Sequence, residues 1–358
     1  MITFGLIITI LLIILGFLFK SNKTISVLQF LWIAILLIGS NGGMDYNVHE
    51  MIFSEATSNF DLLSLSWLYK LICFLFGNMG YEFVVMNSIV SILILIILYK
   101  LIFTNTKNSA MTLSLFMIFP LADCIIQKRN FAALGIGLIG LFLLLRESKP
   151  KDRILSFVLI LISAQVHPLF YVYFLVWFLM KYDYNKLRYM VLLLTVLGFF
   201  LIPITPNLAS FFMSDSKINF YFYTAKIPLY QSLCWWILHA CFYMLFQIIF
   251  KFSKIDNKNK KIINNLQKLN LIMFIFIFLY YYEPSFFRIY RNVLILFYIG
   301  VGICFESKKL LKNQFYAYLC LIIFAVLVFI SQFVIFGDFG FERLINPIFE
   351  DNYILNGG

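Results

Sequence analysis

The sequence predicts an all-α membrane protein that crosses the bilayer many times. Hydrophobic residues make up 62% of its 358 residues and charged residues only 13%, whereas a soluble domain averages about 45–50% apolar and about 25% charged residues. The apolar residues are gathered into segments that can span a bilayer. The net charge of +11 therefore indicates membrane topology and attraction to anionic lipid. Nucleic-acid binding is not expected, because the basic residues form no nucleic-acid footprint.

Twelve apolar segments are candidate spans, and several of them are short. The long ones cover residues 2–19, 25–39, 81–99, 189–203, 228–250 and 314–336, and the short ones cover 109–122, 131–145, 154–166, 168–180, 269–282 and 292–305. Short segments that end at polar or proline-containing breaks predict tilted or interrupted helices around a cavity. One such break is expected at His167-Pro168, because Pro168 has no amide hydrogen and disfavours helix at His167.

The basic residues predict the orientation of these spans. If the N- and C-termini are extracytoplasmic, 20 of the 28 Lys and Arg residues fall into cytoplasmic loops, as the positive-inside rule requires. The most basic of these loops covers residues 251–268. Longer segments lie outside at about 40–80 and 204–227 and in the tail 337–358. The chain has no internal repeat, so residues 1–358 are predicted to form one integral membrane domain.

Two pairs of basic residues are exceptions to this charge bias. Lys128 and Arg129 precede one span and Arg288 and Arg291 precede another, all on the outer side next to the hydrocarbon core. Cations at that depth are costly and usually functional. Arg288 and Arg291 are three residues apart and would share a face of a helix. Because a guanidinium forms paired hydrogen bonds with phosphate, the pattern predicts a site for an anionic substrate; the alternative is contact with lipid headgroups.

Two further polar residues on the outer side are candidates for acid–base chemistry. His167 lies at the predicted helix break, where a neutral imidazole could accept a proton near neutral pH; a helix cap is the alternative role. Asp45 follows two glycines and precedes Tyr46, and its carboxylate could activate or hold a hydroxyl, or stabilise a turn. The three histidines and six cysteines show no metal-ligand spacing, so no metal or other cofactor is expected.

Four short motifs follow one another in a recognisable order on the predicted outer side. They are Gly43–Tyr46, Gln127–Ala133, Ala164–Leu169 and Phe287–Asn292. The first is similar to a G-x-D-Y segment, the second to an R-Q-x-[IL]-A pattern at the start of a span, and the third to an A-x-x-[FV]-H-x-[ST] pattern. Together they make the chain resemble, over nearly its whole length, the EpsG-type branch of the bacterial Wzy-like polysaccharide (O-antigen) polymerase family.

The resemblance implies a glycosyltransferase that polymerises oligosaccharide repeat units carried on undecaprenyl diphosphate. It places the active site at the outer face of the bacterial cytoplasmic (inner) membrane, in O-antigen, capsule or exopolysaccharide synthesis, and implies a fold similar to polyprenol-dependent glycosyltransferases. Besides the lipid-linked oligosaccharide and membrane lipid, a chain-length regulator and a flippase are candidate partners. His167 or Asp45 would deprotonate the attacking sugar hydroxyl. The implied substrate-binding residues are Arg129, Arg288, Arg291, Lys128 and Tyr46.

Two other functions fit the sequence less well. A flippase for the same lipid-linked sugars would also need many spans and cations for a diphosphate. Alternating access usually comes with internal repeats and polar residues at mid-membrane depth, however, and the sequence shows neither. An outward-facing membrane acyltransferase would also combine His with Arg. An assay that distinguishes lengthening, movement and acylation of a lipid-linked glycan would separate the three.

Overall fold

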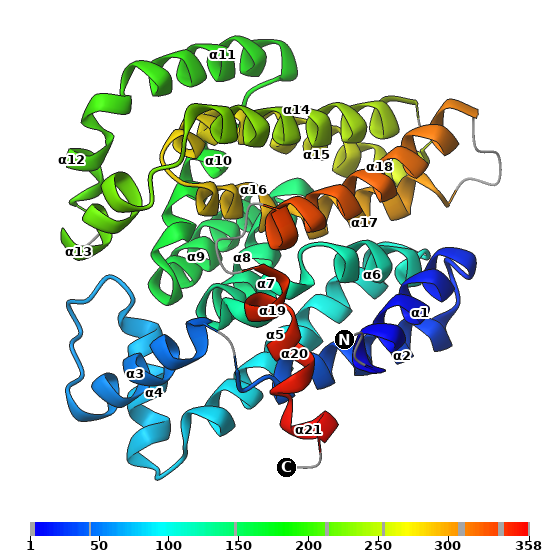
Figure 1. The fold of residues 1–358 in the computed structure, drawn as a ribbon. Coiled ribbons are helices and arrows are strands. Elements are labelled where there is room, and N and C mark those ends of the chain that lie inside the picture. Colours follow the sequence, from blue (N-terminus) through cyan, green and yellow to red (C-terminus); the bar gives the residue numbers. More distant parts are fainter. Residues whose placement is uncertain are drawn as a thin grey trace.

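A computed structural model describes residues 4–42, 44–146, 149–211, 215–252, 255–306, 312–335 and 340–356. These residues form helices and no β-strand; one isolated β-bridge joins Ser40 and Asn352. Figure 1 shows long helices such as α11, α14 and α18 running in similar directions across the molecule, with the shorter α3, α4, α12 and α13 gathered at one end. The prediction of an all-α fold is confirmed.

The helices of the first half are α1 (Phe4–Leu18), α2 (Lys23–Gly39), α3 (Met44–Ser58), α4 (Trp67–Asn78), α5 (Phe83–Asn105), α6 (Ser109–Ile118), α7 (Leu121–Ile126), α8 (Lys128–Arg146), α9 (Pro150–Val166), the 3-10 helix η1 (Pro168–Val172) and α10 (Tyr173–Leu179). The second half contains α11 (Tyr184–Phe200), η2 (Ile202–Ile204), α12 (Thr205–Ala209), α13 (Asp215–Ile218), the π-helix η3 (Asn219–Thr224), α14 (Leu229–Phe252), α15 (Asn257–Ile272), η4 (Met273–Tyr281), η5 (Pro284–Phe287), α16 (Arg288–Arg291), α17 (Leu294–Cys304), α18 (Lys312–Ile330), the π-helix η6 (Ser331–Ile335), α19 (Gly340–Leu344), α20 (Asn346–Glu350) and α21 (Tyr353–Asn356).

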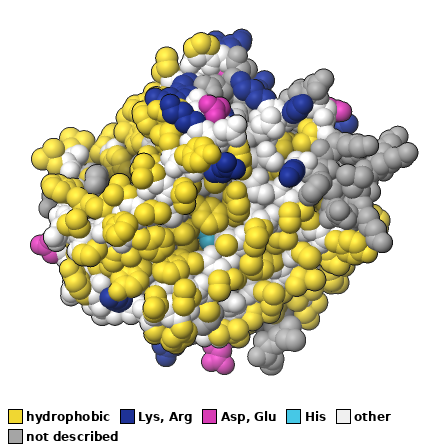
Figure 2. Space-filling view, turned by 90° about the horizontal axis from the view of Figure 1, so that it is seen from above, with side chains coloured by type: hydrophobic (Ala, Val, Ile, Leu, Met, Phe, Trp, Pro, Cys, Tyr) yellow, Lys and Arg dark blue, Asp and Glu magenta, His cyan; other side chains and the backbone are white. Residues whose placement is uncertain are grey.

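Several of these helices can cross a membrane. Within the described residues, five are long and apolar enough, and seven if each of two bent pairs is one span. The five cover residues 83–105, 128–146, 229–251, 259–281 and 315–335. The bent pairs are α11 with η2 and α12, bent by 59°, and η5 and α16 with α17, bent by 43°. The architecture is that of a multi-pass helical membrane protein, and Figure 2 shows one broad face covered mostly by hydrophobic side chains.

The predicted break at His167-Pro168 is confirmed. Helix α9 ends at Val166, and η1 begins at Pro168. His167 itself is extended, with φ −140° and ψ 118°, because the proline ring excludes the helical conformation from the residue before it. The histidine side chain is therefore presented at the junction of two helices.

Two segments that were predicted to connect membrane spans are largely helical. The outer segment 40–80 contains α3 and α4, and most of the segment 251–268 belongs to α14 and α15. In α15 the apolar side chains of Ile263, Leu266 and Leu269 are buried along one face, whereas Lys260 and Lys261 are exposed. This apolar stripe makes the basic segment a packed helix rather than a solvated connector.

Helix α8 lies at the centre of the structure and is mostly buried. Small residues let its neighbours approach closely: a Cβ on Gly137 would lie 2.5 Å from the Phe170 ring, and one on Gly140 would lie 3.1 Å from the Ser156 carbonyl oxygen. The Ser163 hydroxyl donates to the Ala133 carbonyl oxygen at 2.6 Å. Small residues with interhelical hydroxyl contacts are typical of helix packing in membranes. This packing fixes α9, and with it His167, against the start of α8.

Helix α1 provides a test of this close packing. A Cβ on Gly16 would overlap Ser114 Oγ and Gln29 Nε2, which are hydrogen-bonded at 2.8 Å, and would lie 2.7 Å from the Ala110 carbonyl oxygen. We expect Gly16→Ala to reduce stability by about 1–3 kcal/mol, as other overpacked sites do, in thermal unfolding of the detergent-solubilised protein. Ile14→Ala is the control, because Ile14 is exposed on the same helix. Equal stability of the two variants would contradict the close contact of Gly16 with Ser114 and Gln29.

Candidate functional site

Four of the predicted site residues line one cavity. The cavity has a volume of about 570 Å³, and its wall includes Asp45, Arg129, His167 and Arg288. These residues come from α3, the start of α8, the break after α9 and the start of α16. The fold thus brings together polar side chains that are separated by more than 240 positions along the chain.

Helix α3 contributes a face to this cavity rather than a loop. Asp45, Val48, His49 and Ile52 all line the wall, and their spacing of i, i+3, i+4 and i+7 places them on one side of a helix. Asp45 lies in the first turn of α3. Burial raises the pKa of its carboxyl above the ordinary value of 3.8, and the positive charge of Arg288 opposes this rise.

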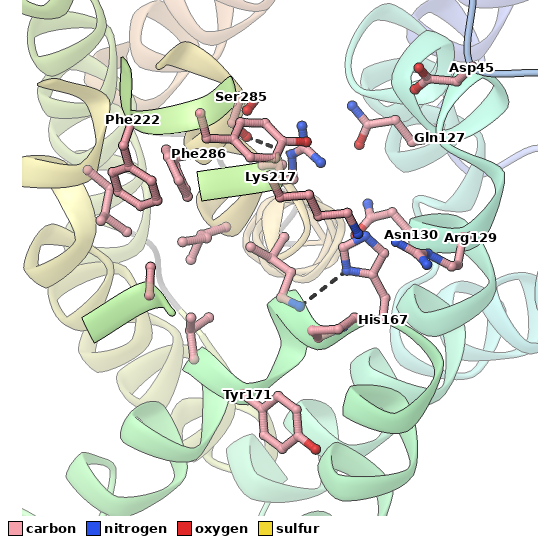
Figure 3. Close-up of a pocket in the computed structure, with 18 of the residues that line it drawn as sticks. Asp45, Gln127, Arg129, Asn130, His167, Tyr171, Lys217, Phe222, Ser285 and Phe286 are labelled. Carbon is pink, nitrogen blue, oxygen red and sulfur yellow. Dashed lines mark hydrogen bonds between the residues drawn. The ribbon is translucent and has the colours of Figure 1, made fainter. Parts of the chain in front are cut away.

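The His167 ring has a fixed orientation at the helix break. Its Nδ1 accepts a hydrogen bond from the Leu169 amide at 3.2 Å, as Figure 3 shows. In a neutral imidazole with Nδ1 as acceptor, the proton is on Nε2, which can donate to a ligand. Burial, assisted by the charges of Arg129 and Arg288, lowers the pKa of His167 well below 6.5. The side chain is therefore a neutral hydrogen-bond donor.

The two cavity arginines have different surroundings. The Arg288 Nε donates to the Ser285 carbonyl oxygen at 2.8 Å, and its terminal nitrogens have no hydrogen-bond partner within the described ranges. The Arg129 guanidinium lies 5.9 Å from the centre of the Tyr69 ring and forms no ion pair with any carboxylate in the part of the chain that the structure describes. Both side chains can therefore offer donors to an anion.

Two further cavity residues were not among the predicted site residues. Lys217, on the short α13, points into the cavity beside His167 (Figure 3), and burial together with Arg129 lowers its pKa. His49 is only 8% exposed, and neither of its ring nitrogens has a hydrogen-bond partner among the described residues. Burial, Arg129 and Lys128 lower the pKa of His49 to about 3. The helical spacing of His49 with Asp45 was the available signal.

The cavity suits an anionic ligand with an apolar part. It combines the cations Arg129, Arg288 and Lys217 with the carboxylate of Asp45, and much of the remaining wall is apolar, including Leu208 and Leu279. Cations in a partly desolvated site act on an anion more strongly than they do in water. Within the described ranges, no group of three His, Cys, Asp or Glu side chains could hold a metal ion.

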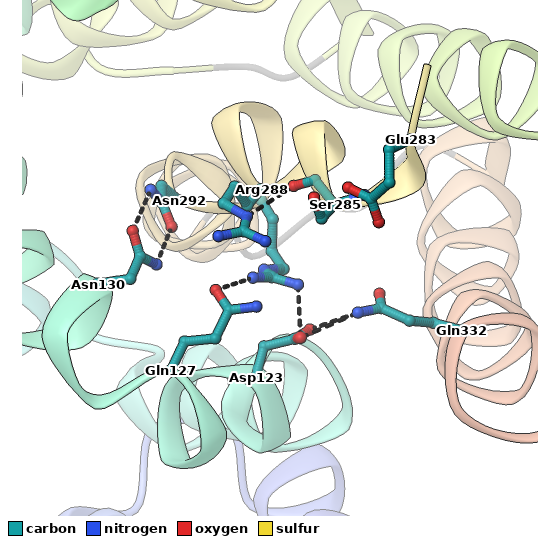
Figure 4. Close-up of polar contacts among 9 residues, drawn as sticks. Asp123, Gln127, Asn130, Glu283, Ser285, Arg288, Asn292 and Gln332 are labelled. Atoms are coloured by element: carbon teal, nitrogen blue, oxygen red, sulfur yellow. Dashed lines mark hydrogen bonds and ion pairs between the residues drawn. The ribbon is translucent and has the colours of Figure 1, made fainter. Parts of the chain in front are cut away.

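Arg291 does not line this cavity, although it was predicted to share a face with Arg288. Its Nη1 lies 2.5 Å from Asp123 Oδ1, and its Nη2 donates to Gln127 Oε1 at 2.8 Å. Asp123 also accepts from Gln332 Nε2 at 2.9 and 3.0 Å (Figure 4). Arg291 is almost fully buried, and a buried guanidinium is stabilised by a carboxylate partner, so its side chain pairs with Asp123 and does not face the cavity.

Lys128 and Tyr46 also lie outside the cavity wall. The Lys128 ammonium donates to the Ser40 carbonyl oxygen at 2.8 Å and lies 5.7 Å from the centre of the Tyr46 ring. The Tyr46 ring in turn packs edge-on against Phe83. These contacts join the end of α2 and the start of α3 to α8, so they support the cavity from behind.

A pair of amides connects the two cation-bearing segments. The Asn130 side chain donates to Asn292 Oδ1 at 2.9 Å, and Asn292 donates back to Asn130 Oδ1 at 3.2 Å (Figure 4). The Tyr173 hydroxyl donates to the Ile289 carbonyl oxygen at 2.7 Å. Asn130 follows Arg129 directly, and Ile289 follows Arg288, so these bonds fix the backbones that carry both cavity arginines.

Fold and cavity together define a multi-pass helical membrane protein with a cationic site at one end of its helices. The family model described as the EpsG family matches residues 23–346, and the chain belongs to this family of membrane proteins of polysaccharide biosynthesis. No curated protein and no solved structure matches the chain. The matched residues include every one that lines the cavity, and the resemblance inferred from the sequence motifs is confirmed.

The buried ion pair behind the cavity can be tested by a double-mutant cycle. Removing one partner of a buried pair leaves an uncompensated charge and typically costs about 3–5 kcal/mol, whereas replacing both by apolar residues is often neutral. We expect Asp123→Leu to be strongly destabilised in thermal unfolding, and the double variant Asp123→Leu/Arg291→Met to recover most of the loss. Arg343→Ala, at an exposed position on α19, should be neutral. A double variant no more stable than Asp123→Leu would contradict the pairing.

Proposed function

We propose that this protein is a polysaccharide polymerase, a glycosyltransferase that joins oligosaccharide repeat units carried on undecaprenyl diphosphate. Its active site would face outward from the bacterial cytoplasmic membrane, which the chain would cross twelve times. The observation that carries the proposal is the cavity in which Arg129, Arg288 and Lys217 lie beside Asp45 within a largely apolar wall. A lipid-linked diphosphate has the matching chemistry: two adjacent anionic groups, a sugar on one side and a polyprenyl chain on the other.

The reaction would depend on charge stabilisation of the leaving group. An acceptor sugar hydroxyl attacks the anomeric carbon of the donor sugar, the bond from that carbon to the diphosphate oxygen breaks, and undecaprenyl diphosphate leaves with both bonding electrons. Arg129 and Arg288 hold the developing negative charge, and fixed cations in a desolvated site lower the barrier because they need little reorganisation. Lys217 would contact the second phosphate or the sugar attached to it.

The geometry favours Asp45 over His167 as the base that takes the hydroxyl proton. Nδ1 of His167 already accepts from the Leu169 amide, so its neutral ring offers a proton on Nε2 instead of a lone pair. Asp45 has an acceptor carboxylate, and its raised pKa makes it a stronger base than an exposed aspartate. His167 would then donate to a substrate oxygen and orient the sugar.

The position of the polar groups favours this function over a flippase. Arg129, His167 and Arg288 lie at the starts or ends of their helices, which places the polar wall at one end of the bundle. A transporter would be expected to carry such groups near the middle of the membrane. A chain-length regulator and a flippase would be separate partners.

A surface-polysaccharide gel tests the proposed function. In a deletion strain, we expect wild type to restore a ladder of polymer lengths and Arg288→Ala to give single repeat units, because one lost charge-stabilising group typically costs about 10²–10³ in rate. Arg343→Ala, with an exposed arginine outside the cavity, should give a full ladder at equal expression. A full ladder from Arg288→Ala would contradict the assigned role, and loss of even the single-repeat band would indicate transport.

The identity of the base is tested with purified protein and lipid-linked repeat units. Asp45→Asn should reduce the polymerisation rate by about 10²–10⁴, the usual contribution of a general base, whereas His167→Gln, which retains an N–H donor, should lose less. In the wild type the rate should fall as the pH drops through the pKa of Asp45, at a pH above 3.8, because burial raises that pKa. Equal losses in both variants, or an acidic limb that persists in Asp45→Asn, would contradict Asp45 as the base.

A further inference from the structure

A second cavity lies at the other end of the central helix. It has a volume of about 1290 Å³, and its wall includes Ile139, Phe142 and Arg146 from the last turns of α8. Arg129 and Arg146 are 17 residues apart on this helix, which corresponds to about 26 Å at the helical rise of 1.5 Å per residue. The hydrocarbon core of a bilayer is about 30 Å thick. The two cavities therefore lie at opposite membrane surfaces when α8 crosses the bilayer.

The second cavity is strongly basic. Its wall contains Lys23, Lys100, Lys107, Arg146 and Lys261. Among the described residues of this wall, Glu306 is the only acidic one, and its Oε1 accepts from the Lys107 backbone amide at 2.7 Å. No carboxylate within the described residues forms an ion pair with the side chains of Lys23, Lys100, Lys107 or Arg146. Basic loop residues alone follow from the positive-inside rule, but here α2, α5, α8 and α15 direct theirs toward one hollow.

The inner wall of this cavity is apolar and continues onto the outside of α5. Ile97 and Leu101 line the cavity on the same helix as Lys100. One or two turns before Lys100, Leu93 and Ile96 are 56% and 49% exposed. Because residues three and four apart are neighbours on a helix, Leu93, Ile96 and Lys100 form one continuous line. An apolar stripe on the lipid-facing side thus ends at a basic group at the cavity rim.

We propose that the second cavity binds an anionic phospholipid of the membrane, with its phosphate among Lys100, Lys107 and Arg146 and an acyl chain along Leu93 and Ile96 of α5. Basic pockets between helices on the cytoplasmic side of a membrane bind anionic headgroups in this way. The surplus of positive charge favours an anion, and the adjoining exposed apolar stripe favours an acyl chain beside it. The site is separate from the polymerase cavity and does not depend on the proposed reaction.

Lipid retention by the purified protein tests this site. The probes are phosphatidylglycerol and phosphatidylcholine of equal chain length, measured by native mass spectrometry, with inorganic phosphate as a competitor. We expect phosphatidylglycerol to bind and phosphatidylcholine not to bind. The double variant Lys100→Gln/Arg146→Gln should bind phosphatidylglycerol about thirtyfold more weakly, since each cation near the membrane surface contributes about five- to sixfold in affinity and the two factors multiply.

The matched control is Lys186→Gln/Arg188→Gln, which also removes two cations but at positions on α11 outside the second cavity. Unchanged affinity in this control would support a local site. Equal weakening in both double variants would overturn the proposal, because it would show general attraction to the basic surface. If inorganic phosphate displaces bound phosphatidylglycerol as effectively as added phosphatidylglycerol does, the proposal would also be overturned, in favour of a soluble anion. Thermal unfolding of all variants checks that each is folded.

Discussion

The buried ion pair between Arg291 and Asp123 is the interaction on which the cavity lined by Asp45, Arg129, His167 and Arg288 depends. Both side chains are about 95% buried, so each charge would be strongly disfavoured without the other. The pair joins α16 to α7, and its hydrogen bonds extend to Gln332 on η6 and to Gln127, which itself lines the cavity. Segments from three distant parts of the sequence therefore meet at one charge pair, and the cavity is formed on one side of it.

The sequence predicted those residues of the candidate site that local signals mark. Arg129 and Arg288 stood out because their charges oppose the topological bias, and His167 because Pro168 enforces a break in the helix. Asp45 was recognised from its motif, and these four side chains do line one cavity. Each of these signals is contained in a few neighbouring residues, so it can be read without knowledge of the tertiary structure.

The remaining parts depend on long-range packing that the sequence does not display. Arg291 looked equivalent to Arg288 because its partner Asp123 is 168 positions away and occurs in an apolar segment. Lys217 lines the cavity from the short α13, which no motif in its neighbourhood indicates. The segment 251–268 was expected to be a loop because its lysines outweighed the apolar stripe of α15, and burial of that stripe against the bundle decides the outcome. The lysine-rich composition of this segment therefore does not determine its conformation, which depends on the helices that α15 packs against.

The reciprocal amide pair of Asn130 and Asn292 has a consequence for how the site responds to charge. Both amides are buried and uncharged, so the arrival of a dianion or the movement of a proton leaves their protonation unchanged. The segments that carry Arg129 and Arg288 are consequently joined by a contact whose own charge does not change with pH. The framework of this cationic cavity is therefore insensitive to the electrostatic changes that its arginines and Asp45 respond to.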